Sequence, residues 1–175
     1  MNPERGGPRA IERTNTMNIR DYDTKLGMAF QGDVSIIPIP ADIAIDRSDE
    51  IAPMSGRLIL QEGEVSGHHH AIALLERPAF DDTPSRAVEK LMADASAGKI
   101  PLPTAMLYRD PKAIAEMLRR RIITRTDLAV GVLVIEVGPM CLTHEEHDGI
   151  RIPPGCYLIG RQVESAGSEE RRVQD

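Results

Sequence analysis

The stretch AVGVLVIEV, at residues 129–137, is the most apolar run in the chain and decides the class of fold that the sequence predicts. Its Val and Ile residues favour a β-strand, and its apolar character at nearly every position indicates a strand covered on both faces. The run is far shorter than the roughly 20 residues that a membrane-spanning helix needs. The sequence therefore predicts a buried strand in a β-rich protein.

Further strand-like stretches lie on both sides of this run. They are residues 32–40 (GDVSIIPIP), 56–67 (GRLILQEGEVSG), 68–76 (HHHAIALLE), 140–146 (MCLTHEE) and 156–164 (CYLIGRQVE). Short β-prone runs between Gly and Pro turns are typical of all-β domains. We expect a mainly β fold, a small barrel or sandwich, over residues 29–165. Its core must be aliphatic, because aromatic residues make up only 3% of the chain.

Residues 78–127 interrupt the strand pattern and predict a two-helix insertion. Apolar residues recur there at helical spacing in two groups: Val88, Leu91 and Met92, then Ile114, Met117 and Leu118. Ser85 and Asp110 are suited to cap the two helices, and Pro111 fits a first helical turn.

The two ends of the chain are polar and lack apolar periodicity. We expect residues 1–28 to form a flexible N-terminal arm and residues 166–175 a polar C-terminal tail. Such an arm suits contacts that order only against a partner, so we expect a homo-oligomer or a larger protein assembly formed through it.

The net charge of −6 argues against general affinity for nucleic acid or for anionic membrane surfaces. Cys141 and Cys156 do not form a short metal or redox motif, which favours a reducing compartment. The N-terminus has no hydrophobic signal core. We therefore expect a cytoplasmic or virion-associated protein that does not enter a membrane.

All five histidines of the chain fall in two short motifs, which makes a shared role the leading hypothesis. On a strand, side chains alternate between faces, so His68 and His70 point one way and His69 points the other. His144 and His147, at i and i+3, would lie on opposite faces of a regular strand. They can face one site only if the chain turns within HEEH.

Imidazoles at this spacing are suited to bind a divalent metal ion, with His68, His70, His144 and His147 as candidate ligands. The donor set does not distinguish zinc, iron, manganese, nickel and copper. Glu145 and Glu146 are candidates for a carboxylate ligand, a partner of an imidazole or a catalytic acid or base. The alternative is a structural cluster in which hydrogen bonds satisfy the imidazoles.

Several segments of the chain resemble a family of small, uncharacterised bacterial and bacteriophage proteins. The matching segments are QGDVSIIPI, LQEGEVSGHHHAI, LTHEEHDGIRIPPGCYLIGRQVE and the closing RRVQD, within residues 31–76 and 128–175. The resemblance implies matching histidines at 68, 70, 144 and 147 and matching glutamates at 145 and 146. It implies no activity, and members are usually shorter between the two histidine motifs.

A looser resemblance is to cupins, which hold a metal ion in a β-barrel with a His-x-His pair and a later histidine. The IPPG turn at residues 152–155 resembles the turn of the second cupin motif, but Cys156, Tyr157 and Leu158 follow it where cupins place their last histidine. The resemblance therefore extends to architecture alone.

Two hypotheses on function follow from these observations. The first is a metal-binding β-domain whose site performs metal-assisted hydrolysis or oxidation, with Glu145 and Glu146 as acid or base groups. The second is a non-catalytic assembly or virion-associated protein whose histidines organise a loop or a subunit interface.

Overall fold

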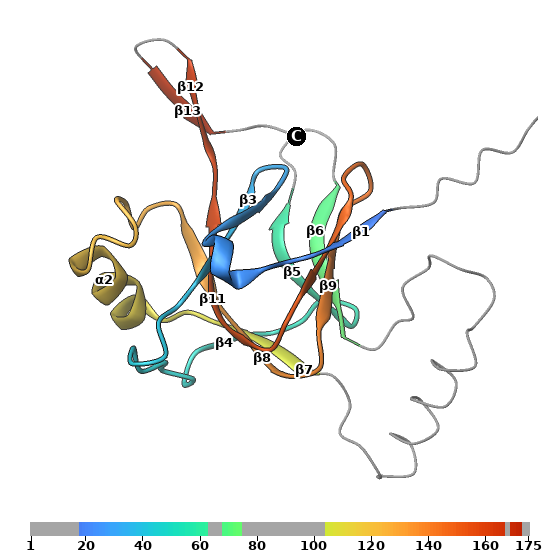
Figure 1. Cartoon of the computed structure of the whole chain (residues 1–175), viewed down its shortest axis with the longest axis horizontal. Coiled ribbons are helices and arrows are strands. Elements are labelled where there is room, and N and C mark those ends of the chain that lie inside the picture. Colours follow the sequence, from blue (N-terminus) through green and yellow to red (C-terminus); the bar gives the residue numbers. More distant parts are fainter. Residues whose placement is uncertain (1–17, 63–67, 75–103, 167–168, 173–175) are drawn as a thin grey trace, which may run out of the picture.

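Two β-sheets enclose a common core in the computed structural model, which describes residues 18–62, 68–74, 104–166 and 169–172 (Figure 1). The five-stranded sheet has the spatial order β1 (Ile19–Asp21), β10 (Gly149–Ile152), β9 (Met140–Thr143), β6 (His69–Ala73) and β5 (Arg57–Glu62). The six-stranded sheet has the order β2 (Ala29–Gln31), β3 (Val34–Pro38), β11 (Gly155–Arg161), β8 (Ala129–Val137), β7 (Thr104–Tyr108) and β4 (Glu50–Ile51).

Strand β8, the apolar run of the sequence, lies inside the six-stranded sheet between β11 and β7. Its side chains alternate between two cores: Leu133 and Ile135 join the core between the sheets, and Val132 and Val134 join the core on the other face. Position 131 requires glycine because strand β7 lies close to it. A Cβ atom on residue 131 would lie 2.8 Å from the Tyr108 carbonyl oxygen. The prediction of a strand buried on both faces is confirmed.

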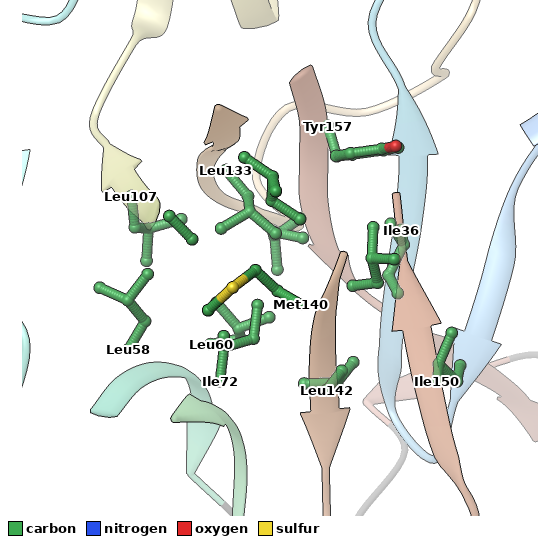
Figure 2. Packing of buried hydrophobic residues seen from close by; sticks show 14 of the residues in the cluster. Ile36, Leu58, Leu60, Ile72, Leu107, Leu133, Met140, Leu142, Ile150 and Tyr157 are labelled. Atoms are coloured by element: carbon green, nitrogen blue, oxygen red, sulfur yellow. The ribbon is translucent and has the colours of Figure 1, made fainter. Parts of the chain in front are cut away.

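The larger core lies between the two sheets and is aliphatic apart from one tyrosine (Figure 2). Both sheets contribute fully buried side chains to it, among them Ile36, Leu60, Ile72, Leu133, Leu142, Ile150 and Ile159. Tyr157 also packs there and donates its hydroxyl proton to the Pro153 carbonyl at 2.8 Å, which satisfies its polar group. Side chains from strands far apart in sequence therefore hold the sheets together.

The second core lies between the six-stranded sheet and helix α2 (Pro111–Arg119). Asp110 caps the helix by accepting a hydrogen bond from the Ala113 N–H at 2.9 Å, and Pro111 occupies the first turn, as predicted. The second carboxylate oxygen of Asp110 accepts from the Asp46 N–H at 2.7 Å. Met117 is fully buried against the sheet, so the helix forms a third layer.

The mainly β prediction is confirmed, and the six strands that the sequence indicated are present. The barrel alternative is wrong, because two separate sheets rather than a closed one surround the core. Of the two helices predicted for residues 78–127, the second is present as α2, the single α-helix of the described residues, and the first lies outside them. Strand β7 lies within residues 78–127 and pairs with β8, because Ala105 and Leu107 alternate into the core.

The predicted ends also differ from the structure. Residues 19–26, which were assigned to a flexible arm, contain β1 and the short 3-10 helix η1 (Thr24–Leu26), while residues 1–17 lie outside the described part. Strand β1 pairs in parallel with β10 and so gains backbone hydrogen bonds that its polar sequence does not reveal. Strand β13 (Glu169–Arg172), within the predicted tail of residues 166–175, pairs with β12 (Val163–Ala166), and the two form a hairpin that projects beyond β11 (Figure 1).

Among the described residues, no helix has both the length and the apolar character needed to cross a membrane.

Replacing Leu133 by alanine tests the assignment of the central core. Leu133 is fully buried between the sheets, so we expect Leu133→Ala to lower the free energy of unfolding by about 2–5 kcal/mol. The matched control is Leu26→Ala, at a leucine that is 83% exposed, where we expect a change within about 0.5 kcal/mol. Denaturant unfolding measures both, and equal losses would contradict this packing.

Candidate metal site

The two histidine motifs meet because strands β6 and β9 are antiparallel neighbours. Their register places Ala71 opposite Thr143, so His70, one residue earlier on β6, lies beside His144, one residue after Thr143. Residues 144–148 then bend between β9 and β10. The prediction that the chain turns within HEEH is confirmed, and the turn brings both of its histidines to the same place.

The imidazole rings of four histidines form one cluster. The ring centroids of His70 and His144 are 4.2 Å apart, those of His144 and His147 are 4.5 Å apart, and those of His70 and His147 are 5.8 Å apart. These three rings are stacked, with interplanar angles of 18–24°. The His68 ring meets His144 edge-on, at 5.7 Å and 80°. Segments about 75 residues apart in sequence thus converge at one point.

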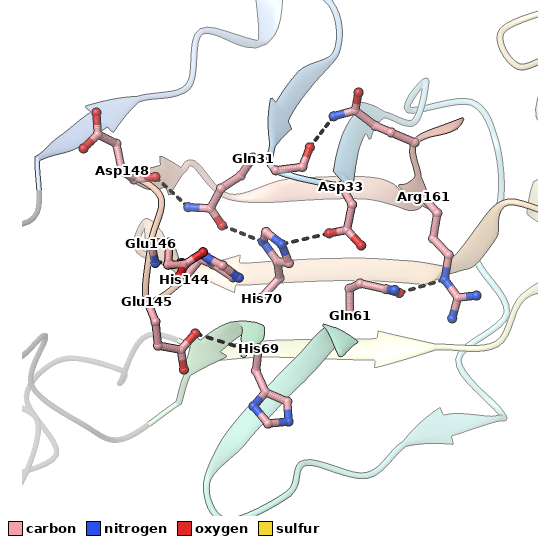
Figure 3. Close-up of polar contacts among 12 residues, drawn as sticks. Gln31, Asp33, Gln61, His69, His70, His144, Glu145, Glu146, Asp148 and Arg161 are labelled. Atoms are coloured by element: carbon pink, nitrogen blue, oxygen red, sulfur yellow. Dashed lines mark hydrogen bonds and ion pairs between the residues drawn. The ribbon is translucent and has the colours of Figure 1, made fainter. Parts of the chain in front are cut away.

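His69 lies on the opposite side of β6 from this cluster, as the alternation of side chains predicted (Figure 3). Its contribution to the site is made by the backbone: the His69 N–H donates a hydrogen bond to Glu145 Oε2 at 3.1 Å. This bond ties the HEEH turn to the first residue of β6.

Gln31 connects strand β2 to the histidine cluster. Its Nε2 group donates hydrogen bonds to the Leu142 carbonyl at 3.2 Å and to the Asp148 carbonyl at 2.6 Å (Figure 3). Its Oε1 atom must therefore act as the acceptor toward His70 Nδ1, 3.1 Å away. One buried carboxamide thus connects β2 with both histidine motifs and places a proton on Nδ1 of His70.

Asp33 contacts the other nitrogen of the same ring. Its Oδ1 atom lies 2.8 Å from His70 Nε2, and both side chains are buried. Asp33 reaches this position through a two-residue hairpin turn between β2 and β3, in which Gly32 has a φ of +52°. Both nitrogens of His70 therefore face oxygen atoms of the QGDV segment.

His144 is oriented by the backbone of its own turn. Its Nδ1 atom accepts a hydrogen bond from the Glu146 N–H at 3.1 Å, so a neutral His144 ring carries its proton on Nε2. A buried imidazole with one nitrogen in this bond has a fixed orientation.

Glu145 and Glu146 differ in how closely they approach the imidazoles. Partial desolvation by itself would raise the pKa of Glu145, but the hydrogen bond from the His69 N–H, together with the nearby His144 and His68 rings, holds that pKa below its usual value. Glu145 is therefore ionised at neutral pH. Glu146 is exposed, and its Oε1 atom is 3.7 Å from His68 Nδ1, which is too long for a hydrogen bond.

Within the part of the chain that the structure describes, two sets of three side chains could hold a metal ion. One is His70, His144 and His147; the other is His68, His144 and Glu145. In each set the possible ligand atoms lie within 4.8 Å of one another. His144 belongs to both sets, and Glu146 belongs to neither.

Sequence reasoning missed Gln31 and Asp33 as parts of this site. The signal was present, since QGDV is one of the segments that carry the family resemblance. A glutamine and an aspartate on either side of a turn glycine read as solvent-exposed, however, and only the packing of β2 and β3 near β6 shows that they are buried.

Comparison with known proteins places the chain in a family without assigning an activity. Residues 30–162 match the family model described as Domain of unknown function (DUF8820). The match includes Gln31, Asp33 and all five histidines. No curated protein and no solved structure matches the chain.

Substituting Gln31 tests its role in joining the two motifs. Gln31→Leu keeps the approximate size but leaves two carbonyls and the His70 Nδ1–H without their partner, at about 1–3 kcal/mol for each buried group. We expect a loss of at least about 3 kcal/mol in the free energy of unfolding. The control is Gln162→Leu, because Gln162 is only partly buried and its side chain donates to one carbonyl, that of Gly32. A Gln31→Leu protein as stable as this control would show that the Gln31 hydrogen bonds do not stabilise the fold.

Proposed function

Since the chain belongs to the DUF8820 family, whose description assigns no function, we propose from the site itself that the protein binds a divalent transition-metal ion at the histidine cluster. His68, His70, His144 and His147, with the adjacent Glu145, supply the donor atoms from which the ligands are drawn. His144 is a ligand in either arrangement because both possible sets contain it.

The convergence of four imidazoles carries this proposal. Imidazole is a common ligand of transition-metal ions, and several imidazoles close together can bind one ion jointly. Each ring lies 4.2–5.8 Å from at least one other ring of the cluster, and the Glu145 carboxylate is close enough to join two of them as a ligand. Imidazole and carboxylate together suit zinc, iron, manganese, nickel and copper.

The way in which His70 is held fixes the arrangement of the cluster. Its Nδ1 atom donates to Gln31 Oε1, and its Nε2 atom lies 2.8 Å from Asp33 Oδ1. These contacts hold the ring in one orientation, 4.2 Å from the His144 ring. Neighbours held in this way orient the ligands of metal centres.

An ion held by three protein ligands keeps positions for water or substrate. Metal-assisted hydrolysis or oxidation is therefore the reaction class we propose for this site. Glu146, an exposed carboxylate adjacent to the ligands in sequence, is the candidate acid or base, because it is in neither set of possible ligands.

Metal analysis of full-length, tag-free protein tests the proposal. After loading with Zn²⁺ and removal of excess metal, we expect about one equivalent of metal per chain, as for a single protein site. We expect His144→Ala to lose this metal, because both possible sets lose a member. His69→Ala is the matched control and should retain it, since its ring faces away from the cluster.

Circular dichroism and thermal unfolding of both variants confirm that they are folded. Absence of stoichiometric binding by the unmodified protein, with zinc and with each of the other four metals, would refute the proposed function. Equal metal contents in the His144→Ala and His69→Ala proteins would do the same.

A further inference from the structure

We propose that the ion is held by His68, His144 and Glu145, a two-histidine, one-carboxylate site with open positions, while His70 and His147 act as positioning residues for His144. This inference rests on the proposed function and assigns the ligands within it. Proximity does not separate the two possible sets, because their atoms meet the same 4.8 Å limit. The two sets differ in the orientation of their rings, in the hydrogen bonds that their side chains already make, and in the exposure of their side chains.

The orientation of the rings favours the set of His68, His144 and Glu145. An ion bound to an imidazole nitrogen lies near the plane of the ring, along the nitrogen lone pair. His70, His144 and His147 are stacked with interplanar angles of 18–24°, so their lone pairs lie in nearly parallel planes rather than pointing to one position. The planes of His68 and His144 cross at 80°, which allows one ion to lie in both.

The contacts of His70 favour the same choice. Its Nδ1 atom is paired with Gln31 Oε1 and its Nε2 atom lies 2.8 Å from Asp33 Oδ1. An ion at either nitrogen would have to displace one of these buried contacts. His70 instead presents a fixed ring face, 4.2 Å from His144, against which the ligand ring packs.

The Glu145 carboxylate is already oriented by a hydrogen bond. Its Oε2 atom is held by the His69 N–H at 3.1 Å, which orients the carboxylate in the way that hydrogen bonds orient metal ligands elsewhere. The same bond joins Glu145 to the residue that follows His68, so Glu145 and His68 are held at a fixed spacing.

Exposure determines what else the ion would bind. Glu145 is exposed and His68 is partly exposed, whereas His70 is fully buried. Because two of the three ligands reach the surface, an ion held by them keeps coordination positions that face solvent. The ligand class that fits those positions is water or a small anionic donor.

Binding must also change one hydrogen bond in the HEEH turn. If the ion binds His144 Nδ1, it takes the lone pair that accepts the Glu146 N–H; if it binds Nε2, a neutral ring must carry its proton on Nδ1. Either way the Glu146 N–H loses its acceptor. The amide of Glu146 is therefore an internal reporter of ligation by His144.

Electron paramagnetic resonance of the full chain with one equivalent of Cu²⁺ tests the ligand assignment. We expect hyperfine structure from two imidazole nitrogens in the unmodified protein and in His147→Ala, and from one in His68→Ala. We expect Glu145→Gln, a surface substitution that preserves shape, to weaken Cu²⁺ binding roughly tenfold or more, and His69→Ala to leave it unchanged. Three nitrogens that fall to two in His147→Ala would overturn the assignment and leave the proposed function standing.

Two further measurements use the same proteins. In a ¹H–¹⁵N spectrum, saturating Zn²⁺ should shift the Glu146 amide, and an unchanged amide with metal bound would overturn ligation by His144. Azide should alter the Cu²⁺ spectrum if positions are open, and an unaltered spectrum would overturn the open site. Failure of the unmodified protein to bind either metal would overturn the proposed function and this assignment together.

Discussion

The antiparallel pairing of β6 with β9 is the constraint on which the site depends. With Ala71 opposite Thr143, the start of one strand meets the end of the other, and residues 70 and 144 become neighbours although about 75 positions separate them. Because side chains alternate along a strand, a shift of one residue would turn His70 away from the cluster. The register is fixed by the core, since Ile72 and Leu142 are paired and both fully buried between the sheets. The packing that stabilises the fold therefore also positions the imidazoles.

The polar part of the cluster is stabilised by contacts from the other sheet. Gln31 and Asp33 extend from the β2–β3 hairpin to the two nitrogens of His70, and Gln31 also satisfies carbonyls at Leu142 and Asp148. Buried polar groups of this kind are stable only when every member has a partner, so they specify one arrangement of the two sheets. The site is in this sense a polar continuation of the apolar core shown in Figure 2.

The cluster changes in character from its interior to its surface. His70, with its two oxygen contacts, is fully buried and belongs to the scaffold. His144 is in ring contact with the other three histidines of the cluster, stacked against His70 and His147 and edge-on to His68. Glu145 is ionised and exposed. The support is thus rigid inside the protein, and the donor atoms are accessible at its surface. A metal centre that exchanges ligands needs both, because fixed neighbours orient the ligands and open positions admit small molecules.

The sequence by itself determined the β-rich class, the buried strand at residues 129–137, the cap of α2 and the separation of His69 from its neighbours, because each follows from local periodicity or from a single turn. It missed β1 and β7, whose short or polar sequences gain their stability from hydrogen bonds to distant strands. It also left open whether the sheets close into a barrel. Only the tertiary structure decided that, and only it brought Gln31 and Asp33 to His70, because sheet packing and strand register depend on contacts between residues far apart in the chain.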